Sequence, residues 1–506
     1  MIATTSNAGR SPGWAGPAAG KGAGSNVAWA LAGGLALSLL GVAWGFAVAV
    51  GEEGALLLCA AAIACLFVFL DFRVGVVLLV LSMPFSASTV FPHQMFGITG
   101  LNPLNLVIAA TFVSYLGQAL RERSATRLAP GYLFWLYLAP IVVAGAMGLP
   151  HATEIPSWAM LLDLVQFNNP VGYVRDMVAR PLFLVLFALL VGAAAARSKE
   201  PLRLLGPMVV SVWVIGLLVI GFVIASGASL SELAGSNERT FLSPLGIHAN
   251  ELGRLYTVAY ALCLFTWARS RDVALRFVLV ATMALVVVAL ALTFSRGAFL
   301  GFLIVNALFL LWHRNALTWI FGGLALALLL WKLPGAIADR ATMGFDSDLN
   351  TISAGRLDEI WIPLMPTFWD SPLFGHGLGS ILWSAPLKSG QILQVSHPHN
   401  AYLQALLDIG IVGTVLVLAF FVRVWRGFRR MTRDASLNAT ERGFFEGAAA
   451  GLAAFGATAI AGSSLTPAAD QCFLWFAVGM MYGLSARQDG RAGKEARGRK
   501  EGRPGR

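Results

Sequence analysis

The chain has 506 residues, of which 57% are hydrophobic and only 12% are charged, and its mean hydropathy is +0.72. Soluble domains carry about 25% charged residues, so this composition excludes a soluble globular enzyme, a disordered chain and a coiled coil. It predicts an all-α polytopic membrane protein, because helices satisfy their own backbone hydrogen bonds in lipid. We interpret the net charge of +10 as an orientation signal in the loops, and we expect no nucleic-acid partner.

Membrane-spanning helices are predicted from the apolar segments, since about 20 apolar residues cross the hydrocarbon core. The sequence offers enough of these segments for about 12–14 spans. Pro84 interrupts the third segment. The approximate bounds are 27–50, 54–70, 74–91, 103–120, 131–148, 181–196, 204–226, 250–268, 274–294, 297–313, 316–333, 402–425, 443–462 and 468–486.

These segments divide the chain into five parts. Residues 1–25 are rich in Gly, Ala and Ser and predict a disordered cytoplasmic tail. The apolar run that follows is too long for a signal-peptide core, so we predict a first span there and not a cleaved signal. Residues 26–333 then hold the first eleven spans, 334–401 form a long loop, and 402–486 hold the last three. Residues 487–506 form a basic cytoplasmic tail that we expect to lie against anionic membrane lipid.

The basic residues alternate between the predicted loops. With both termini in the cytoplasm, most of the 36 lysines and arginines fall on the cytoplasmic side, as the positive-inside rule requires. Segments 149–180 and 334–401 are then long loops on the periplasmic face. Long loops with structure of their own are commonly functional. The second contains a predicted amphipathic helix with one face formed by Leu357, Ile360, Trp361 and Leu364.

The first candidate group on that face is Ser295-Arg296-Gly297, which joins two spans almost without a loop. Ser295 is predicted to cap the following helix, which places Arg296 in the first helical turn. Backbone N–H groups, the helix dipole and a guanidinium then all favour an anion. The structural alternative is that Arg296 extends to the membrane surface and only anchors the helix.

The second candidate is Arg356, which precedes several aromatic residues and the segment SPLFGHGLGS in the long loop. Pairing of Arg356 with Asp358 or Glu359 on neighbouring turns is the structural alternative. The glycines within 375–379 would permit close approach of the backbone to a ligand.

The third candidate group is the segment SHPHNAYLQALLDIGIVG. Pro398 keeps His397 out of helical geometry. Asn400 is predicted to cap the next span, so His399 lies at the positive end of a helix, where imidazolium is disfavoured. A neutral imidazole is a competent general base at neutral pH. The alternative is a surface histidine near the end of a loop.

Metal sites have weaker support. Asp346 and Asp348 form a D-x-D pattern that holds metals in many glycosyltransferases, but this spacing also arises by chance in a polar loop, so their role stays open. His376, His397 and His399 have no cysteine or carboxylate at recognisable zinc spacing. The cysteines lie in apolar stretches without a disulfide or zinc pattern. We therefore expect no metal and no cofactor.

One further segment opens a span on the same face. Gly246-Ile247-His248-Ala249-Asn250 precedes Arg254 and the predicted helix 250–268. These residues either line the same cavity as His399 or only cap their helix, and the sequence leaves both interpretations open.

The candidates together resemble a known family. From His399 to Gly413 the sequence has H-N, nine residues and G-x-x-G, which resembles the signature of the O-antigen ligase and O-antigen polymerase superfamily. The SRG segment at 295–297 and the GR…W…PLFGHGLG segment at 355–379 occur in that family's order. The resemblance covers roughly residues 235–425.

The resemblance implies a membrane glycosyltransferase that takes a glycan from undecaprenyl diphosphate at the outer face of the bacterial inner membrane. By motif, it implies that His399 is the catalytic base and that Arg296 and Arg356 bind the diphosphate. Family ligases invert the anomeric centre without a metal. The candidates for supporting roles are Asn400, His397, Asp408 and Arg254.

Two features differ from the family pattern, namely the larger number of predicted spans and the extra His397. They leave open whether the acceptor is lipid A core or the growing chain of an O-antigen or exopolysaccharide polymerase. A polysaccharide transporter or flippase would need paired or ion-coupling carboxylates near mid-membrane. Asp408 lies inside a predicted span, and no partner is evident from the sequence; the other candidates, Asp71, Glu446 and Asp470, lie near span ends.

Overall fold

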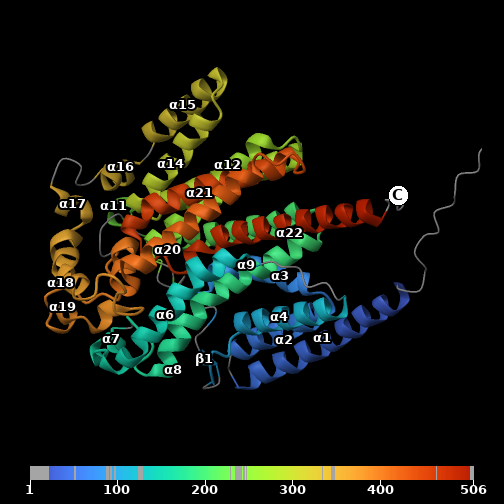
Figure 1. Cartoon of the computed structure of the whole chain (residues 1–506), viewed down its shortest axis with the longest axis horizontal. Helices are drawn as coiled ribbons and strands as arrows, with labels where there is room; N and C mark the ends of the chain where they lie inside the picture. Colours follow the sequence, from blue (N-terminus) through green and yellow to red (C-terminus); the bar gives the residue numbers. More distant parts are fainter. Residues whose placement is uncertain are drawn as a thin grey trace, which may run out of the picture.

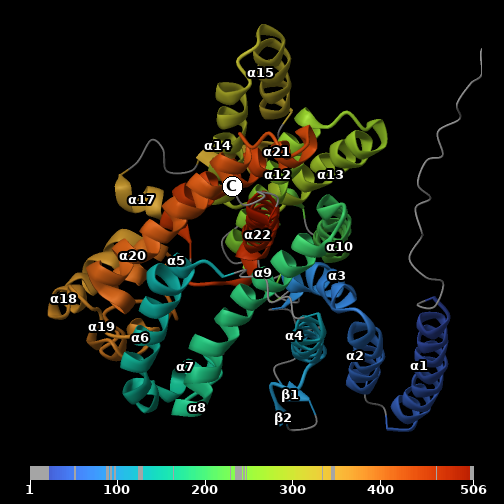
Figure 2. The ribbon, with the colours of Figure 1, turned by 45° about the vertical axis from the view of Figure 1, so that its right-hand side comes forward.

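The computed structural model is helical and is shown in Figures 1 and 2. Residues 1–21, the main part of the predicted N-terminal tail, lie outside the described residues, and the first helix begins at Gly22. The structure describes residues 22–50, 53–86, 91, 94–95, 98–122, 129–162, 164–227, 229–233, 242, 246, 248–332, 334–342, 348–462 and 464–501.

The first half of the chain forms mainly long helices and one small antiparallel hairpin, in which β1 (Gln94–Met95) pairs with β2 (Ile98–Thr99). The helices in this half are α1 (Gly22–Val50), α2 (Glu53–Leu70), α3 (Phe72–Ser82) with η1 (Met83–Phe85), α4 (Pro103–Arg121), α5 (Gly131–Leu133) with η2 (Phe134–Leu138) and α6 (Ala139–Gly148), η3 (Leu149–Glu154), α7 (Ser157–Leu161), α8 (Pro170–Tyr173) with η4 (Val174–Ala179) and α9 (Arg180–Arg197), and η5 (Pro201–Leu204) with α10 (Leu205–Ser226).

The second half holds both long helices and the short helices of the long loop. They are α11 (Leu230–Leu233), α12 (Ala249–Arg269), α13 (Val273–Ala291), α14 (Arg296–Trp312), α15 (Ala316–Trp331), α16 (Gly335–Thr342), α17 (Leu349–Ser353), η7 (Leu357–Trp361) with α18 (Ile362–Asp370), η8 (Ser380–Trp383), α19 (Ala385–Lys388), α20 (Ala401–Met431), α21 (Ala439–Thr458) with η9 (Ala459–Ala461), and η10 (Ala469–Gln471) with α22 (Cys472–Glu501).

The all-α multi-pass membrane fold predicted from composition is confirmed. Each predicted span overlaps a helix. In the part of the chain that the structure describes, four shorter apolar helices accompany the long ones, namely Trp29–Gly45, Leu56–Leu70, Phe72–Phe85 and Arg296–Trp312. Within the described residues, 7 helices are long and apolar enough to cross a membrane, namely Pro103–Arg121, Gly131–Glu154, Pro170–Arg197, Pro201–Ser226, Val273–Ala291, Ala401–Met431 and Ala439–Ala461.

Two boundaries differ from the prediction. Within the described residues of the predicted span 74–91, the helix ends at Phe85, because Pro84 tightens the chain into a 3-10 turn. The predicted loop 149–180 is itself helical from Pro170 onward. Asn169 starts that helix by accepting a hydrogen bond from the Gly172 N–H at 2.8 Å. The charged residues that made 170–180 look like a loop are accommodated as an Arg175–Asp176 ion pair of 2.6 Å.

The basic C-terminal segment also differs from a simple tail. Helix α22 continues from Cys472 through the predicted boundary at 487 and ends at Glu501. All four cysteines are free thiols, and Cys263 and Cys472 are buried, as their apolar sequence surroundings predict.

Helix α12 lies at the centre of its part of the molecule, where it packs against α13, α14, α21 and α22. It carries Glu251 and Arg254 and is less apolar than its neighbours, and those neighbours bury nearly all of it. Close helix contacts depend on glycine: a Cβ at Gly447 of α21 would lie 2.4 Å from the Ala261 carbonyl oxygen of α12. This is the small-residue contact typical of membrane helices.

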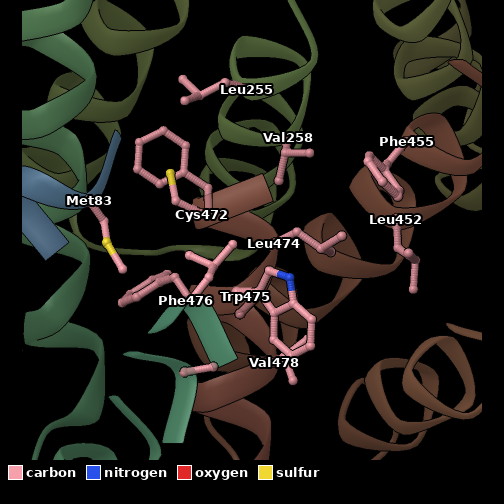
Figure 3. Close-up of a cluster of buried hydrophobic side chains, with 14 of the residues drawn as sticks. Met83, Leu255, Val258, Leu452, Phe455, Cys472, Leu474, Trp475, Phe476 and Val478 are labelled. Carbon is pink, nitrogen blue, oxygen red and sulfur yellow. The ribbon is translucent and has the colours of Figure 1, made fainter. Parts of the chain in front are cut away.

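Helix α22 completes this core. Figure 3 shows its Cys472–Val478 segment between side chains of α12 and α21. Trp475 is fully buried there, and its indole N–H donates to the Gln471 side chain at 3.2 Å. On its other side α22 packs against α9, and a Cβ at Gly479 would lie 2.2 Å from the Ala188 carbonyl oxygen.

The short helices gather at one end of the long ones. In Figures 1 and 2, α7 and α8 lie beside α18 and α19 at this end, and the C-terminus of α22 points away from it. We call it the loop end. The predicted amphipathic helix forms here as η7 and α18, and its Ile360 and Leu364 are buried in the main core, as predicted.

Candidate active site

The histidine segment lies at the loop end, directly before α20. Asn400 caps α20 as predicted, since its side chain accepts hydrogen bonds from the N–H groups of Tyr402 at 3.1 Å and Leu403 at 3.2 Å. His399 has φ +53°, a left-handed conformation that is uncommon for any residue other than glycine. The ring of His397 meets that of His399 edge-on, with 4.2 Å between their centroids. The backbone therefore turns sharply at His399 and presents both imidazoles together.

The amphipathic helix holds this turn in place. The indole N–H of Trp361 donates to the carbonyl oxygen of Pro398 at 2.8 Å. Arg356 precedes the same helix by one residue, at the N-cap of η7, and is half-buried. Trp361 thereby links the segment that carries Arg356 to the segment that carries His399.

The glycine-rich segment 375–379 approaches the protein's own backbone. We predicted close approach to a ligand, but a Cβ at Gly375 would lie 2.6 Å from the Asp408 carbonyl carbon, and one at Gly377 would lie 2.2 Å from the Gly148 nitrogen. In return, the N–H groups of His376 and Gly377 donate to carbonyl oxygens of α20 at 2.8 and 3.0 Å. These glycines allow the loop to pack closely against α20 and α6.

Helix α20 is broken where this loop inserts. Gly410 has φ +63° and ψ −173°, which is not helical. The N–H groups of Ile411 and Val412 donate instead to the carbonyl oxygens of Pro372 and Leu373, at 2.8 and 3.1 Å. The loop 372–379 therefore replaces part of the hydrogen bonding that α20 gives up at Gly410.

Asp408 fixes the same junction. Its Oδ1 accepts from the Ser380 N–H at 3.0 Å and from the Ser380 hydroxyl at 2.7 Å, and its Oδ2 accepts from the Gln404 amide at 3.1 Å. The sequence showed no partner for Asp408, and the structure supplies two. Both carboxylate oxygens are engaged, so Asp408 connects α20 to the long loop.

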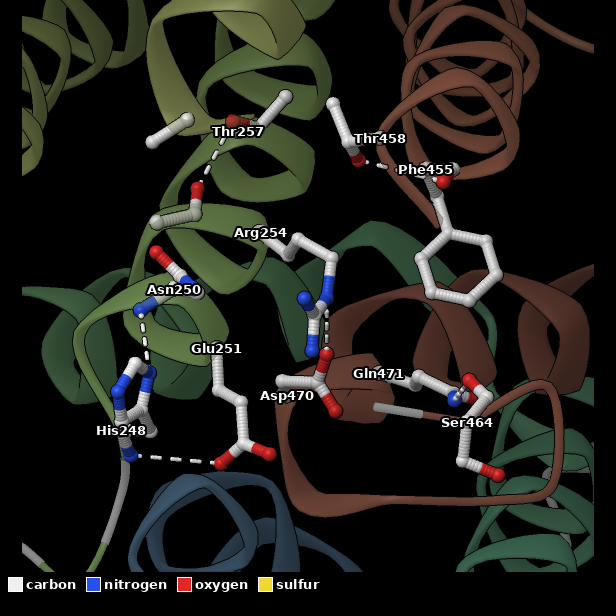
Figure 4. Close-up of polar contacts among 12 residues, drawn as sticks. His248, Asn250, Glu251, Arg254, Thr257, Phe455, Thr458, Ser464, Asp470 and Gln471 are labelled. Atoms are coloured by element: carbon white, nitrogen blue, oxygen red, sulfur yellow. Dashed lines mark hydrogen bonds and ion pairs between the residues drawn. The ribbon is translucent and has the colours of Figure 1, made fainter. Parts of the chain in front are cut away.

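A third histidine comes from the start of α12. His248 caps α12, because its Nδ1 accepts from the Asn250 N–H at 3.2 Å, and Glu251 completes a capping box (Figure 4). The ring centroids of His248 and His399 are 6.4 Å apart. His248 therefore fits both interpretations of segment 246–250, because it caps α12 and also lies beside His399.

Arg254 lies one turn further along α12, in a buried ion pair. Its Nε is 2.7 Å from Asp470 Oδ2, and the two side chains are only 5% and 2% exposed. Figure 4 shows this pair across the gap between α12 and the segment that leads into α22. A buried charge needs such a partner. The sequence placed Asp470 near a span end without identifying its partner, because 216 positions separate the two residues.

Arg296 lies at the neighbouring helix start. Ser295 caps α14 as predicted by accepting from the Ala298 N–H at 3.3 Å, and Arg296 is the first residue of α14. The Ser295 hydroxyl also donates to the Asn250 side chain at 2.8 Å, which ties the start of α14 to the start of α12. Arg296 is half-buried and belongs to the element next to His248.

The electrostatic surroundings of the histidines show which groups gather. The pKa of His399 is lowered to about 2, mainly by burial and in addition by the nearby basic groups of His397, Arg356, His248 and Arg254. Burial likewise lowers the pKa of His397 to about 4, with the same neighbouring charges contributing. The unfavourable transfer of imidazolium into a buried basic site is the physical cause. Both imidazoles are therefore neutral at pH 7.

The structure thus brings Arg356, Arg254 and three histidines into one cluster, with Arg296 on the adjoining helix start. Of the D-x-D pattern, the structure describes only Asp348. Asp346 lies outside the described residues, and Asp348 caps α17 by accepting from the Thr351 N–H at 2.9 Å and the Thr351 hydroxyl at 2.7 Å. Within the described part of the chain, no group of three or more His, Cys, Asp or Glu could hold a metal ion.

The fold and this cluster define a multi-pass helical membrane protein with neutral imidazoles and guanidiniums gathered at one end of its helices. Residues 281–418 match the family model Wzy_C, O-antigen ligase. The matched region includes Arg296, Arg356 and His399, while Arg254 and Asp470 lie outside it. No curated protein matches the chain.

The matched family model indicates a class of chemistry. A Wzy_C O-antigen ligase domain implies a glycosyltransferase-type enzyme that performs ligase- or polymerase-type glycan transfer in the membrane, with lipid-linked glycans as substrates.

Proposed function

We propose that the protein transfers a glycan from undecaprenyl diphosphate to the hydroxyl of lipid A core at the periplasmic face of the bacterial inner membrane. The observation that supports this best is the cluster of a neutral, half-buried His399 with Arg356 and Arg254. It combines a proton acceptor with cationic groups that suit a diphosphate.

The reaction needs one displacement. The acceptor oxygen attacks the anomeric carbon, its proton passes to the imidazole of His399, and the bond to the diphosphate breaks with its electron pair leaving on the phosphate oxygen. One displacement inverts the anomeric centre, whereas retention ordinarily needs a carboxylate nucleophile. Asp408 does not suit that role, because Ser380 and Gln404 already bond both of its oxygens.

The arginines would bind the leaving diphosphate. Arg356 lies beside His399, and Arg296 combines its guanidinium with the N-terminal end of α14. Guanidiniums and helix starts stabilise developing negative charge without a metal ion. We therefore propose that transfer continues in the presence of EDTA.

The donor also determines how strong a base His399 is. Free imidazole with a pKa of about 2 is a weak base. A bound diphosphate brings negative charge to Arg356 and Arg254 and raises the pKa of His399, since a nearby opposite charge favours imidazolium. His399 would thus accept a proton readily only when the donor is in place.

The test is transfer by purified protein from a lipid-linked donor. His399→Ala should lower kcat by about 10²–10⁴-fold, the usual contribution of a general base. The matched control is His151→Ala, because His151 is a partly exposed loop-end histidine that pairs with Glu154 at 2.7 Å. Normal transfer by the His399 variant would refute the base assignment.

The acceptor is tested with the same preparation. Glycan attached to lipid A core identifies a ligase, and a longer lipid-linked polymer identifies a polymerase, which would use the same donor and site. This product analysis tests the acceptor alone and leaves the base assignment to the His399 variant.

A further inference from the structure

A second site lies at the opposite end of α20 from His399. A cavity of about 600 Å³ is present there. Since α20 has 31 residues, its two ends are separated by about 45 Å along the helix. The cavity is therefore on the other face of the membrane. Its lining residues are Trp425, Arg426, Arg429, Arg430, Arg433 and Asp434.

The cavity is strongly basic, because its single carboxylate already has other partners. Asp434 Oδ1 accepts from the Ser436 N–H at 2.8 Å, and its Oδ2 accepts from the Gln488 amide at 2.6 Å. Four guanidiniums thus face a cavity that holds one engaged acid. An occupant with negative charge would complement them.

One of the lining arginines is held by a side chain of α14. The guanidinium carbon of Arg429 lies 4.3 Å from the centroid of the Trp312 ring. Such a cation–π contact holds a guanidinium in position while leaving its edge N–H groups available to an anion. Arg426, Arg430 and Arg433 are exposed around it.

An apolar stripe on α20 leads to the cavity. Ile411, Val415 and Val422 are 40%, 58% and 46% exposed. Their spacing at i, i+4 and i+11 places them on the same face of the helix as Arg426 and Arg429. Trp425 lies between the apolar stripe and the arginines, where tryptophan commonly marks the membrane surface. An occupant with both acyl chains and an anionic headgroup would match this face.

We propose that this cavity binds the headgroup of an anionic phospholipid, with the acyl chains along Ile411, Val415 and Val422. Four guanidiniums suit a headgroup with two phosphates, so diphosphatidylglycerol should bind more tightly than phosphatidylglycerol. Basic pockets between membrane helices recognise such headgroups through phosphate contacts. This site is independent of the proposed glycan transfer.

The experiment measures lipid retention by native mass spectrometry of the full-length protein in detergent. The probes are diphosphatidylglycerol, phosphatidylglycerol, zwitterionic phosphatidylethanolamine and inorganic pyrophosphate. The variant is Arg426→Gln with Arg430→Gln, and both side chains are exposed, so the fold should tolerate them. The control is Arg271→Gln with Arg314→Gln, which removes the same charge from exposed positions at the same end of the helices.

The wild-type protein and the control should retain diphosphatidylglycerol, and the cavity variant should bind it about 30-fold more weakly, from roughly fivefold for each of the two basic residues. The site would be overturned if the cavity variant bound diphosphatidylglycerol as tightly as the wild-type protein does. It would also be overturned if the control variant lost as much affinity as the cavity variant. Pyrophosphate binding as tight as that of the lipid would show a soluble anion site and overturn the lipid assignment. Thermal unfolding of both variants checks that they are folded.

Discussion

His399 is the residue in which backbone and electrostatics combine most closely. Its left-handed φ of +53° turns the chain just before the Asn400 cap. Trp361 holds that turn through the Pro398 carbonyl oxygen. The imidazole thus lies next to Arg356, and burial with that positive charge keeps it neutral. Strained backbone of this kind persists where the surroundings hold it, and it is concentrated at functional sites.

The lowered pKa of His399 predicts the pH dependence of transfer. In the free enzyme His399 stays neutral down to about pH 2 and His397 to about pH 4, so kcat/KM should show no loss from either group between pH 8 and about 5. With donor bound, the diphosphate raises the pKa of His399, so kcat should fall at a higher pH than kcat/KM as the solution is acidified. Initial rates across this pH range check the prediction, and identical acid limbs in the two profiles would contradict it.

The Arg254–Asp470 pair predicts a large effect on stability. Asp470→Asn leaves a buried guanidinium without its counter-charge and should cost about 3–5 kcal/mol, seen as a lower Tm. Arg254→Met with Asp470→Leu removes both charges and should restore the Tm, because apolar replacement of a buried pair is often neutral. If Arg254 also supports the diphosphate, the double variant should remain weak in donor binding, with a raised KM. An unchanged Tm for Asp470→Asn would contradict the structural role.

At the scale of elements, the central feature is the break in α20. The chain gives up helical hydrogen bonds at Gly410, and the loop 372–379 replaces them from outside the helix. Asp408 and Ser380 strengthen the same junction. This arrangement fixes the long loop, and with it Arg356, relative to the helix that begins beside His399.

Gly410→Ala tests this junction. A Cβ at Gly410 would lie 2.3 Å from the Leu373 carbonyl oxygen, and the residue has φ +63°. The left-handed conformation costs roughly 1–2 kcal/mol for alanine, and the steric overlap adds about 1–3 kcal/mol. The Tm and the transfer rate should both fall. Gly117→Ala is the matched control, since nothing lies within 4 Å of a Cβ there, and its Tm should hold or rise. If the Gly410 variant were as stable as this control, glycine would not be required at the break in α20.

The sequence predicted local features of these elements and missed those that depend on distant contacts. The caps at Ser295 and Asn400 follow from a few adjacent residues, and both are confirmed. The glycines at 375–379 were assigned to ligand contact because nothing adjacent in sequence indicates that α20 breaks at Gly410. The partner of Arg254 could not be identified either, since several acids lie near span ends and only packing selects Asp470.

At the scale of the whole molecule, the buried charges bear on the choice between enzyme and transporter. An ion-coupled transporter needs carboxylates that can exchange a cation. Glu446 is instead paired with Arg269 at 2.6 Å, and Asp470 is paired with Arg254 at 2.7 Å. These paired charges favour a fixed bundle with chemistry at the loop end, in agreement with the O-antigen ligase family model that residues 281–418 match.

The proposed orientation in the membrane gives the last prediction. If the loop end is periplasmic, a cysteine at Lys388 is accessible from outside and one at Ser436, in the turn after α20, is not. Both positions are exposed, whereas Cys263 and Cys472 are buried and Cys59 and Cys65 are half-buried, so the introduced thiols should label faster than the native ones. A membrane-impermeant maleimide on intact spheroplasts should label Lys388→Cys, and it should label Ser436→Cys only after permeabilisation. Wild-type protein gives the background from the native thiols. The reverse pattern would place His399 in the cytoplasm and rule out transfer at the periplasmic face, while the lipid site on α20 would remain on the membrane face opposite His399.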